Sequence, residues 1–301
     1  MLDVCLAGTS GMMPLKNRWL SSLWVEYQGM AVLVDCGEGT QLALSHAGLK
    51  HCHIDAILIT HFHADHISGL PGMLLALTNY GKTGKVQLYG PVGLRGIVNK
   101  LRCICAHLSF ELEIIELNPK QCSCFDTAGL HIEAMPLEHS TPCLGYAMSL
   151  FRKPVFNPDK ARALEIPLQY WKTLHAGNSV EHEGKLFTTE MVTDKARKTI
   201  KVTYMTDSLY FAQMSDFAYN SDLLVCEGMY GDDTSAQKSN DKHHMLFSQA
   251  ATVAKNSCSK QLWLTHYSPS LVCPYEFEHE AKSIFANTVI SKDGQKITIE
   301  E

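Results

Sequence analysis

The sequence lacks any long apolar run and any export signal. No apolar stretch among the 301 residues approaches the roughly 20 residues that a helix needs to cross a bilayer. The N-terminal segment MLDVCLAGTSGMM has neither the basic start nor the apolar core of a secretory signal. We therefore expect a cytoplasmic protein that does not associate with membranes.

Strong net charge, internal repeats and low-complexity tracts are also missing. A formal net charge of −5 argues against a protein that coats nucleic acid through charge alone. A hydrophobic content of 46% over 301 residues is enough for a sizeable core. Because no linker-like stretch divides the chain, we expect a single domain over residues 1–301.

Cysteine is present in an odd number, eleven. Without an export signal, this count favours free thiols or metal ligands over disulfides. The pairs Cys103/Cys105 and Cys122/Cys124 invite a structural zinc site, but their spacing is narrower than the gaps of about two to four residues in common zinc sites. Cys103 and Cys105 also fall in a helical pattern, where residues two apart point in different directions. Buried or surface thiols are therefore the favoured interpretation.

Strand patterns come in hairpin-like groups and also alternate with helical patterns. This arrangement suits two mixed β-sheets covered by helices. We therefore predict an α/β fold of the αββα sandwich type. The predicted strands are residues 2–7, 23–27, 31–35, 56–60, 86–89, 112–116, 130–135, 145–150, 201–205, 223–226 and 261–265, and the predicted helices are 39–46, 68–80, 93–105, 209–218, 247–257 and 274–285.

The segment ILITHFHADHISGLPG, residues 57–72, places three histidines and an aspartate directly after an apolar run. Loops at the carboxyl ends of strands are where open α/β sheets commonly bind ligands. His61 and His63 can face one point, while Asp65 and His66 can face a second. Imidazole and carboxylate are donors for zinc, and two adjacent cations can hold a bridging water. The alternative, a polar loop with chance histidines, is disfavoured by the specific spacing HxHxDH.

Three other apolar strand patterns also end in a donor residue. IEAMPLEH ends at His139, VTYMTD at Asp207 and QLWLTH at His266. Each residue alone can be read as an ordinary polar group at a strand end. Together with the HxHxDH segment, they predict one set of metal ligands along one edge of the sheets.

These features resemble the metallo-β-lactamase superfamily and, more narrowly, ribonuclease Z, the endonuclease that matures the 3′ end of transfer RNA. The narrower match rests on GTSGMMPLKNRWLSS near the N-terminus, LVDCGEGTQ at residues 33–41 and LWLTHYSP at residues 262–269. Further matching segments lie between them, so the resemblance covers residues 8–269. It implies a metallo-β-lactamase-like sandwich with an inserted arm.

The resemblance also implies the metal ligands and the chemistry. His61, His63 and His139 would hold one Zn²⁺, Asp65, His66 and His266 would hold a second, and Asp207 would bridge both. Mn²⁺ or another divalent metal is possible in their place. A hydroxide that bridges the zinc ions would attack the phosphodiester and leave a 3′-hydroxyl on the transfer RNA.

Three residues receive catalytic roles from the resemblance. Asp65 would accept the proton of the water. Glu227 and His244 would lie next to the metal ligands, and His244 would donate a proton to the departing ribose oxygen. The family usually shows His-Ser-Thr before the next helix, whereas this chain reads KHHMLFSQAA, so the spacing to the helix selects His244 over His243. A solvated loop histidine is the alternative. HYSPSL after His266 lacks an arginine that often binds phosphate in the family, which puts substrate affinity in question.

Residues 152–201 form a basic segment, with ten Lys or Arg against six Asp or Glu. In the family, an arm at this place grips the transfer RNA, and the enzyme is a homodimer in which one subunit's arm serves the other's active site. Here LQYW replaces the usual Gly-Pro pair of the arm. Lys160, Arg162 and Lys172 are candidate substrate contacts. A solvated surface insertion is the alternative.

The sequence therefore predicts a zinc-dependent endoribonuclease that cleaves precursor transfer RNA at its 3′ side. One alternative is a phosphodiesterase or arylsulfatase-like hydrolase of the same superfamily acting on a small ester, which the altered arm keeps open. A small-ester enzyme would not need a basic grip far from its metals. A metal-binding RNA-binding module without catalysis is a second alternative, which the complete set of seven ligand positions disfavours.

Overall fold

The computed structural model describes residues 1–105, 107–152, 154–194 and 198–300. Its contacts divide the chain into two compact units. The larger unit comprises residues 1–150 and 200–300, and the smaller unit comprises residues 151–199.

The first sheet of the larger unit has the order β16-β1-β2-β3-β4-β5-β6. β16, β1, β2 and β3 are antiparallel neighbours, while β3, β4, β5 and β6 run parallel. Its strands are β1 (Leu2–Gly8), β2 (Ser22–Tyr27), β3 (Met30–Val34), β4 (Ile54–Leu58), β5 (Lys85–Pro91), β6 (Glu111–Leu117) and β16 (Gln295–Ile299).

The second sheet has the order β15-β14-β13-β12-β9-β8-β7 and repeats the mixed pattern of the first. β12 to β15 run parallel, and β7, β8, β9 and β12 are antiparallel neighbours. Its strands are β7 (Ser123–Thr127), β8 (Leu130–Leu137), β9 (Cys143–Leu150), β12 (Ile200–Met205), β13 (Leu223–Glu227), β14 (Leu262–Thr265) and β15 (Thr288–Ile290).

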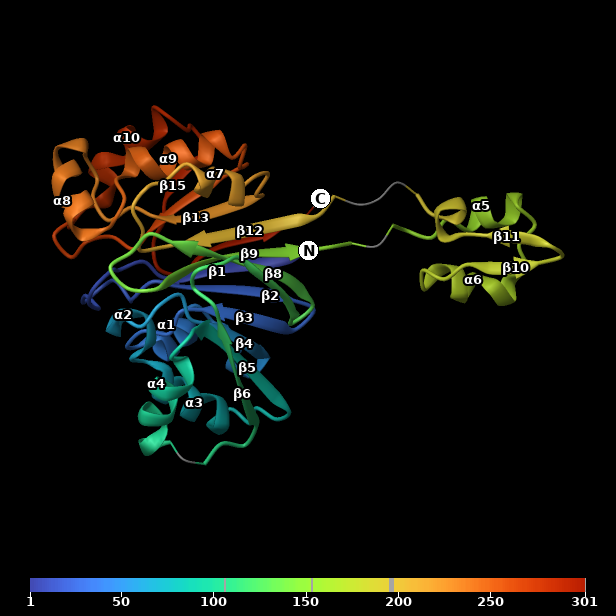
Figure 1. Ribbon diagram of the computed structural model, residues 1–301, viewed down its shortest axis with the longest axis horizontal. Coiled ribbons are helices and arrows are strands. Elements are labelled where there is room, and N and C mark those ends of the chain that lie inside the picture. The colour runs from blue at the N-terminus through green and yellow to red at the C-terminus, as the bar shows by residue number, and fades with distance from the viewer. Residues whose placement is uncertain (106, 153, 195–197, 301) are drawn as a thin grey trace. The chain divides into compact units, whose positions relative to one another are not determined.

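Helices cover the outer face of each sheet (Figure 1). Those packed on the first sheet are α1 (Thr40–His46), α2 (Ala64–Ile67), α3 (Leu70–Asn79) and α4 (Leu94–Leu101). Those on the side of the second sheet are α7 (Gln213–Phe217), α8 (Ala236–Lys242), α9 (Phe247–Asn256) and α10 (Glu278–Lys282). The layers are therefore helix, sheet, sheet, helix, and the predicted αββα sandwich is confirmed.

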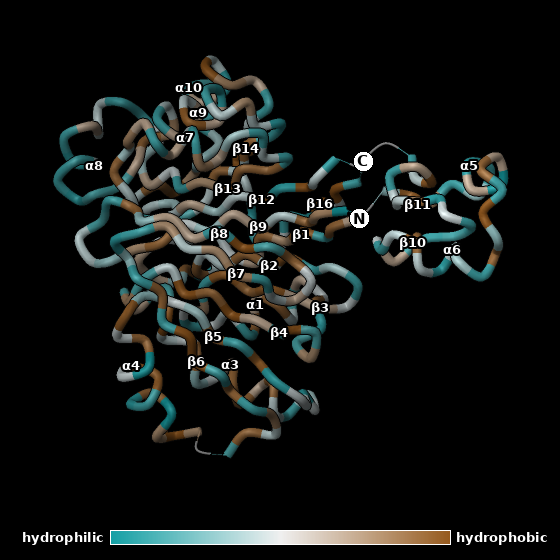
Figure 2. The backbone as a smooth tube through the Cα atoms, turned by 45° about the vertical axis from the view of Figure 1, so that its right-hand side comes forward, coloured by the Kyte–Doolittle hydropathy of each residue, from teal (hydrophilic) through white to brown (hydrophobic). Residues whose placement is uncertain are grey.

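Alternating side chains explain this layering. On β1, Val4 and Leu6 belong to the core between the sheets, whereas Cys5 and Ala7 belong to the core beneath the helices. Successive side chains of a strand point to opposite faces, so each central strand supplies both cores and is largely apolar. Figure 2 shows the consequence, with hydrophobic colour along the central strands and hydrophilic colour on α8.

The parallel strands of each sheet direct the metal-donor candidates to the same edge. His61 follows β4, Asp207 follows β12 and His266 follows β14. Because the carboxyl ends of neighbouring parallel strands lie together, loops that are far apart in sequence meet there.

The smaller unit contains α5 (Pro158–Ala163), α6 (Leu168–His175) and a hairpin of β10 (Val180–His182) and β11 (Lys185–Phe187). Asn157 caps α5 by accepting hydrogen bonds from the backbone N–H groups of Asp159 and Lys160, and proline occupies the first helical position. Tyr170 and Trp171 pack against a small apolar core. The buried members of that core are Ala161, Ile166, Leu174, Phe187 and Val192.

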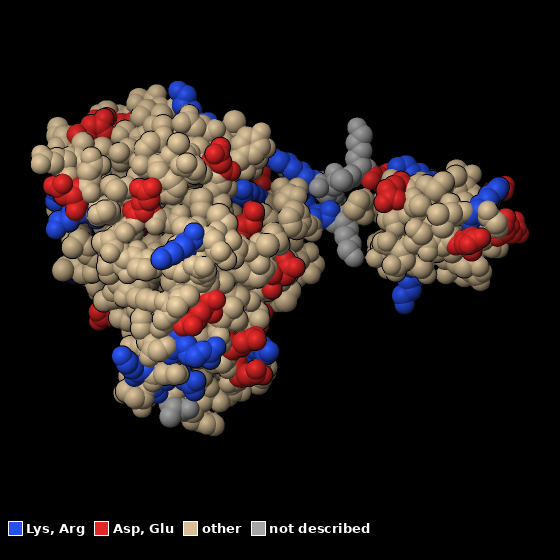
Figure 3. Space-filling view, in the orientation of Figure 1, with Lys and Arg blue, Asp and Glu red and all other residues tan. Residues whose placement is uncertain are grey.

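The described residues of the smaller unit carry balanced charge. Six Lys or Arg face six Asp or Glu over residues 151–152, 154–194 and 198–199. Figure 3 shows both signs interspersed on the visible face of this unit. The excess of positive charge predicted for residues 152–201 therefore depends on Lys153, Lys195 and Arg197, which lie outside the described residues, and on Lys201, which belongs to β12.

The cysteines of the two Cys-x-Cys pairs form no metal site with other described residues. All eleven cysteines are free thiols, with Cys105 buried and Cys103, Cys122 and Cys124 exposed. None of the four belongs to a group of donors that could hold a metal among the described residues. Among all the residues that the structure describes, no helix is long and apolar enough to cross a membrane.

The smaller unit is inserted between two strands that pair directly. Leu150 at the end of β9 is the antiparallel partner of Ile200 at the start of β12. A two-residue turn of Asn-Gly can close such a pair, because both positions tolerate the left-handed conformation of a type I′ turn.

We predict that replacing residues 151–199 with Asn-Gly yields a folded protein, since the two sheets and their cores remain complete. Circular dichroism and thermal melting should show one cooperative transition within a few degrees of that of the full chain. Loss of cooperative unfolding would show that the larger unit requires the inserted one.

Candidate metal centre

The loop after β4 carries four of the predicted donors. His61 and His63 lie in the extended segment between β4 and α2, and Asp65 and His66 lie in the first turn of α2. His61 and His66 are buried. The change from extended chain to helix at Ala64 separates the four donors into two pairs that face different points.

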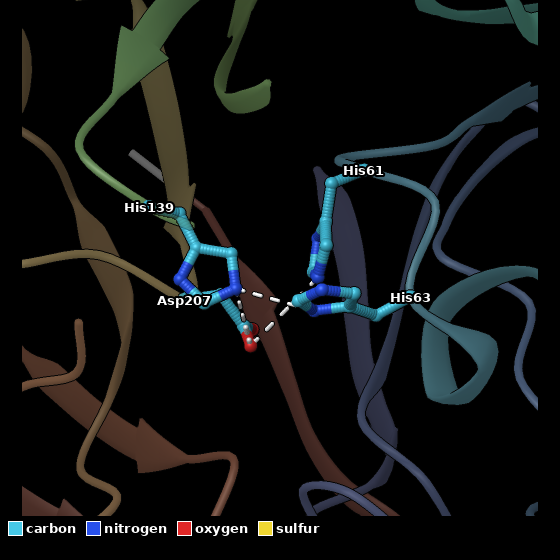
Figure 4. A group of neighbouring side chains, drawn as sticks. All are labelled: His61, His63, His139 and Asp207. Carbon is cyan, nitrogen blue, oxygen red and sulfur yellow. Dashed lines mark hydrogen bonds and ion pairs between the residues drawn. The ribbon is translucent and has the colours of Figure 1, made fainter. Parts of the chain in front are cut away.

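The structure brings all seven predicted donors together in neighbouring groups. Within each group, one donor atom of every residue lies within 4.8 Å of the others. The first group contains His61, His63, His139 and Asp207, and the second contains Asp65, His66 and His266. A third group joins Asp207 and His266 to His244. Figure 4 shows the side chains of the first group converging from the loops that follow β4, β8 and β12.

Asp207 lies between the first two groups. Its Oδ2 is 3.9 Å from His61 Nε2 and from His139 Nε2, and its Oδ1 is 3.3 Å from His66 Nε2 and 3.2 Å from His266 Nε2. Burial alone would raise the pKa of Asp207, but the surrounding imidazoles hold it well below its ordinary value. Asp207 is therefore a carboxylate with one oxygen toward each group.

The unpaired nitrogen atoms of the site fit metal ions. His61 Nε2 is buried and has no hydrogen-bond partner in the described part of the chain. Burial, reinforced by the nearby His66, holds the pKa of His61 well below its ordinary value. A neutral imidazole with an open lone pair aimed at carboxylate and imidazole neighbours is the form in which histidine binds a divalent cation.

Asp35 is hydrogen-bonded to His66, one of the candidate metal ligands, and sequence reasoning did not assign it a role. Its Oδ2 is 2.8 Å from His66 Nδ1, and its Oδ1 accepts hydrogen bonds from the backbone N–H and hydroxyl of Thr60. A carboxylate on the second nitrogen of a metal-binding histidine fixes its tautomer and strengthens it as a ligand. The available signal was the position of Asp35 directly after an apolar strand, which it shares with the predicted donors.

Glu227 and His244 form a hydrogen-bonded pair next to Asp207. His244 Nδ1 lies 2.9 Å from Glu227 Oε2, and Glu227 Oε1 accepts a hydrogen bond of 2.6 Å from the backbone N–H of Ser208. Burial lowers the pKa of His244, but the charge and hydrogen bond of Glu227 outweigh it and raise the pKa to about 9. His243 ends α8 in the left-handed conformation, with φ of 57°, and makes no contact of this kind among the described residues.

A cleft of about 840 Å³ opens over the donors. His63, Asp65, His139, Asp207 and His244 line it. Sequence reasoning did not anticipate the rest of its wall, which includes Met12, Met13, Tyr230, Lys238, Lys242 and Ser270.

The three residues predicted to contact substrate lie in the smaller unit. Lys160 Nζ is 3.2 Å from Asp194, and Arg162 pairs with Asp159 at 2.7 Å while lying over the ring of Trp171. Lys172 is exposed and forms no ion pair with any residue that the structure describes. Their role toward substrate stays a prediction.

Known proteins resemble this chain in sequence and in fold. Residues 2–192 match the model of the family described as Anti-Pycsar protein Apyc1. The ribonuclease Z of Agathobacter rectalis is 46% identical over 299 residues, which cover 99% of this chain and 98% of that protein. Human tRNase Z, short form, superposes with a TM-score of 0.72 at 23% identity, covering 99% and 100% of the two chains. The metallo-beta-lactamase fold protein YhfI of Bacillus subtilis superposes with a TM-score of 0.71 at 20% identity, covering 98% of each chain.

Fold and site together define a metallo-β-lactamase fold protein with a histidine- and aspartate-rich centre suited to a divalent metal. The chain belongs to the ribonuclease Z family of metal-dependent endoribonucleases, and its residues 2–192 also belong to the family described as Anti-Pycsar protein Apyc1. The resemblance noted in the sequence is confirmed.

We predict that Asp35→Asn weakens binding of added Zn²⁺ about 10- to 100-fold, because the amide carries no negative charge and has one acceptor oxygen in place of the two that serve His66 and Thr60. Competition with a chromogenic chelator measures the change. Asp293→Asn is the matched control, since Asp293 also accepts hydrogen bonds from Thr9 and the Trp19 backbone but contacts none of the donors. Equal zinc affinity in the Asp35 variant and the native protein would remove Asp35 from the centre.

Proposed function

We propose that this protein is a zinc-dependent endoribonuclease that cleaves precursor transfer RNA at its 3′ side and leaves a 3′-hydroxyl on the transfer RNA. The observation that carries the proposal is the placement of seven metal donors and the Glu227–His244 pair around one cleft. The names of the full-length relatives supply the nuclease class.

The donor groups fit two Zn²⁺ ions. His61, His63 and His139 would hold one ion, Asp65, His66 and His266 the other, and the two oxygens of Asp207 would reach both. A set rich in imidazole suits zinc, although Mn²⁺ or another divalent ion can use the same donors. When bound, such ions lower the pKa of a water molecule and neutralise charge on the phosphate.

Asp65 is placed to orient the attacking water and to accept its proton. Burial would raise the pKa of Asp65, but hydrogen bonds to His266 and His66 keep the pKa far below its ordinary value, so the group is a carboxylate. The backbone N–H of Met12 donates a hydrogen bond of 2.7 Å to Asp65 Oδ2 and fixes the orientation of the side chain. A fixed carboxylate loses no orientation entropy at the moment of reaction.

His244 is placed to protonate the leaving oxygen. It lines the cleft, its Nδ1 is held by Glu227, and its Nε2 is the ring nitrogen left to face substrate. Glu227 is fully buried and is itself fixed by the Ser208 backbone, so the pair is preorganised. A histidine held in this way is a suitable general acid.

The smaller unit would act as the arm that binds the transfer RNA. Lys172 is exposed and available to phosphate, and Lys160 and Arg162 would exchange their present carboxylate partners for phosphates. Cytoplasmic action and a homodimer, in which the arm of one subunit serves the other, are part of the same proposal.

A hydrolase of a small ester is the second candidate. It is favoured by the altered sequence of the inserted segment, in which LQYW replaces the usual Gly-Pro pair of the arm. The metal centre itself suits either substrate, so the two candidates differ in the need for the smaller unit.

We predict that His244→Ala lowers the single-turnover rate of precursor transfer RNA cleavage by roughly 10²- to 10⁴-fold, the usual contribution of a general acid. Bound zinc, measured by mass spectrometry, should stay at the native level. His243→Asn is the matched control, since asparagine tolerates the left-handed backbone at this position and the side chain makes no contact with Glu227. An unchanged rate in the His244 variant would show that this residue is a solvated loop histidine and not the general acid.

We predict that the variant with Asn-Gly in place of residues 151–199 retains hydrolysis of bis(p-nitrophenyl) phosphate but binds precursor transfer RNA more weakly. Each phosphate contact that is lost should also reduce the slope of log affinity against log salt by about 0.7–0.9. Measuring both substrates with one preparation separates the candidates. Retained RNA cleavage with lost small-ester turnover would favour the small-ester hydrolase.

A further inference from the structure

A tight turn at residues 10–13 stands at the edge of the cleft and is fixed to both sheets. The backbone N–H of Gly11 donates to the Tyr267 carbonyl at 3.0 Å, and the backbone N–H of Met12 donates to Asp65 Oδ2 at 2.7 Å. Within the turn, the Ser10 hydroxyl donates to the Met13 carbonyl at 2.9 Å. The turn is therefore joined to the loop that follows β14 and to α2, the two segments that carry His266, Asp65 and His66.

The turn also packs directly on a metal donor. A Cβ atom added to Gly11 would lie 2.8 Å from the His266 ring, closer than real contacts allow. Glycine at this position lets the backbone pass over the imidazole. As a result, the next two residues are presented to the cleft at a fixed distance from the metal centre.

Those two residues are exposed methionines. Met12 is 63% exposed and Met13 is 52% exposed, and both line the cleft together with His63 and His139. Met12 also has φ of +65°, a left-handed conformation that is disfavoured for residues with a Cβ atom. Neither the exposure of two large apolar side chains nor the backbone strain stabilises the fold, and strain of this kind is concentrated at functional sites.

The methionines form an apolar part of the cleft wall, beside residues with polar side chains. The same cleft is lined by Lys238, Lys242 and Ser270, which suit phosphate and sugar oxygens. Methionine has a flexible, polarisable thioether that packs well against flat aromatic groups of varied shape. In a strand of RNA, the flat group nearest to the cleaved phosphodiester is the nucleobase on either side of it.

We propose that Met12 and Met13 contact the nucleobase next to the phosphodiester that is cut and thereby position that bond over the metal centre. The proposal rests on the proposed function for the identity of the substrate. The contact is apolar and does not read hydrogen-bonding groups, so it tolerates any base. Its effect is on substrate positioning, and the two residues are positioning residues for the reaction.

A double variant, Met12→Gly with Met13→Ser, removes both side chains. Glycine keeps the N–H group that Asp65 accepts and adopts the left-handed conformation without strain, so the melting temperature should not fall. Leu75→Ala is the control, because Leu75 is an exposed apolar residue on α3 that does not line the cleft.

The test combines these variants with precursor transfer RNA in which one nucleotide is abasic, first on the 5′ side of the cut and then on the 3′ side. In the native enzyme and in the Leu75 control, one abasic site should lower kcat/KM about 2- to 10-fold, the range expected for losing a sulfur–aromatic contact. The double variant should be slower by a similar factor on intact RNA and should show no further loss at that abasic site, because the partner is already absent. Equal abasic penalties in the native enzyme and the double variant at both positions would overturn the proposal while leaving the proposed function intact.

If the native enzyme does not cleave precursor transfer RNA, the proposed function is overturned. A second pair of substrates then tests the methionine contact independently of that function. Bis(p-nitrophenyl) phosphate and methyl p-nitrophenyl phosphate release the same leaving group and differ in whether the remaining ester is aromatic. Their intrinsic reactivities cancel when the ratio of kcat/KM values is compared between enzyme forms. A smaller preference for the aromatic ester in the double variant than in the native enzyme would support the methionine contact, and an unchanged ratio would overturn it.

Discussion

The carboxylate of Asp207 and the imidazoles around it are the interaction on which the rest of the site depends. Asp207 is buried, and its two oxygens lie within 3.2–3.9 Å of nitrogen atoms of His61, His66, His139 and His266. A buried carboxylate is costly unless it is paired. Because its partners come from both sheets, the packing of the sheets against each other decides whether this charge is compensated.

The backbone around these residues explains how the strands present them. Asp35, Asp207 and His266 all adopt positive φ, with values of 61°, 47° and 58°, at the points where β3, β12 and β14 end. Aspartate and histidine are among the residues that enter this region most readily. The left-handed turn ends the strand and directs the side chain toward the shared edge, and the paired strands on either side hold the strained conformation in place.

The two units of the chain have separate roles in the proposed reaction. The metal centre belongs entirely to the larger unit, whose β9 and β12 pair directly at Leu150 and Ile200. The smaller unit has its own apolar core around Leu174 and Phe187, so its surface can change without disturbing the donors. This separation is why substitutions such as LQYW in the inserted segment are compatible with a complete set of metal donors.

The sequence by itself determined the layered fold and the donor set. The central strands are short apolar runs, and the predicted donors follow such runs, so strand identity and donor identity are both local properties. The pattern did not show β7, whose first four residues alternate between half-buried and exposed positions at a sheet edge, nor the three-residue strands of the smaller unit. Short or polar strands bury too little apolar surface to leave a period in the sequence.

Only the tertiary structure decided which side chains meet. His66 and His266 are 200 residues apart in the chain, yet their Nε2 atoms lie 3.2 Å apart. The contact of His244 with Glu227, the support of His66 by Asp35 and the exposure of Met12 beside Asp65 likewise arise between segments distant in sequence. A local sequence pattern indicates whether a side chain is buried. Which side chains from distant segments come into contact depends on how the two sheets pack together.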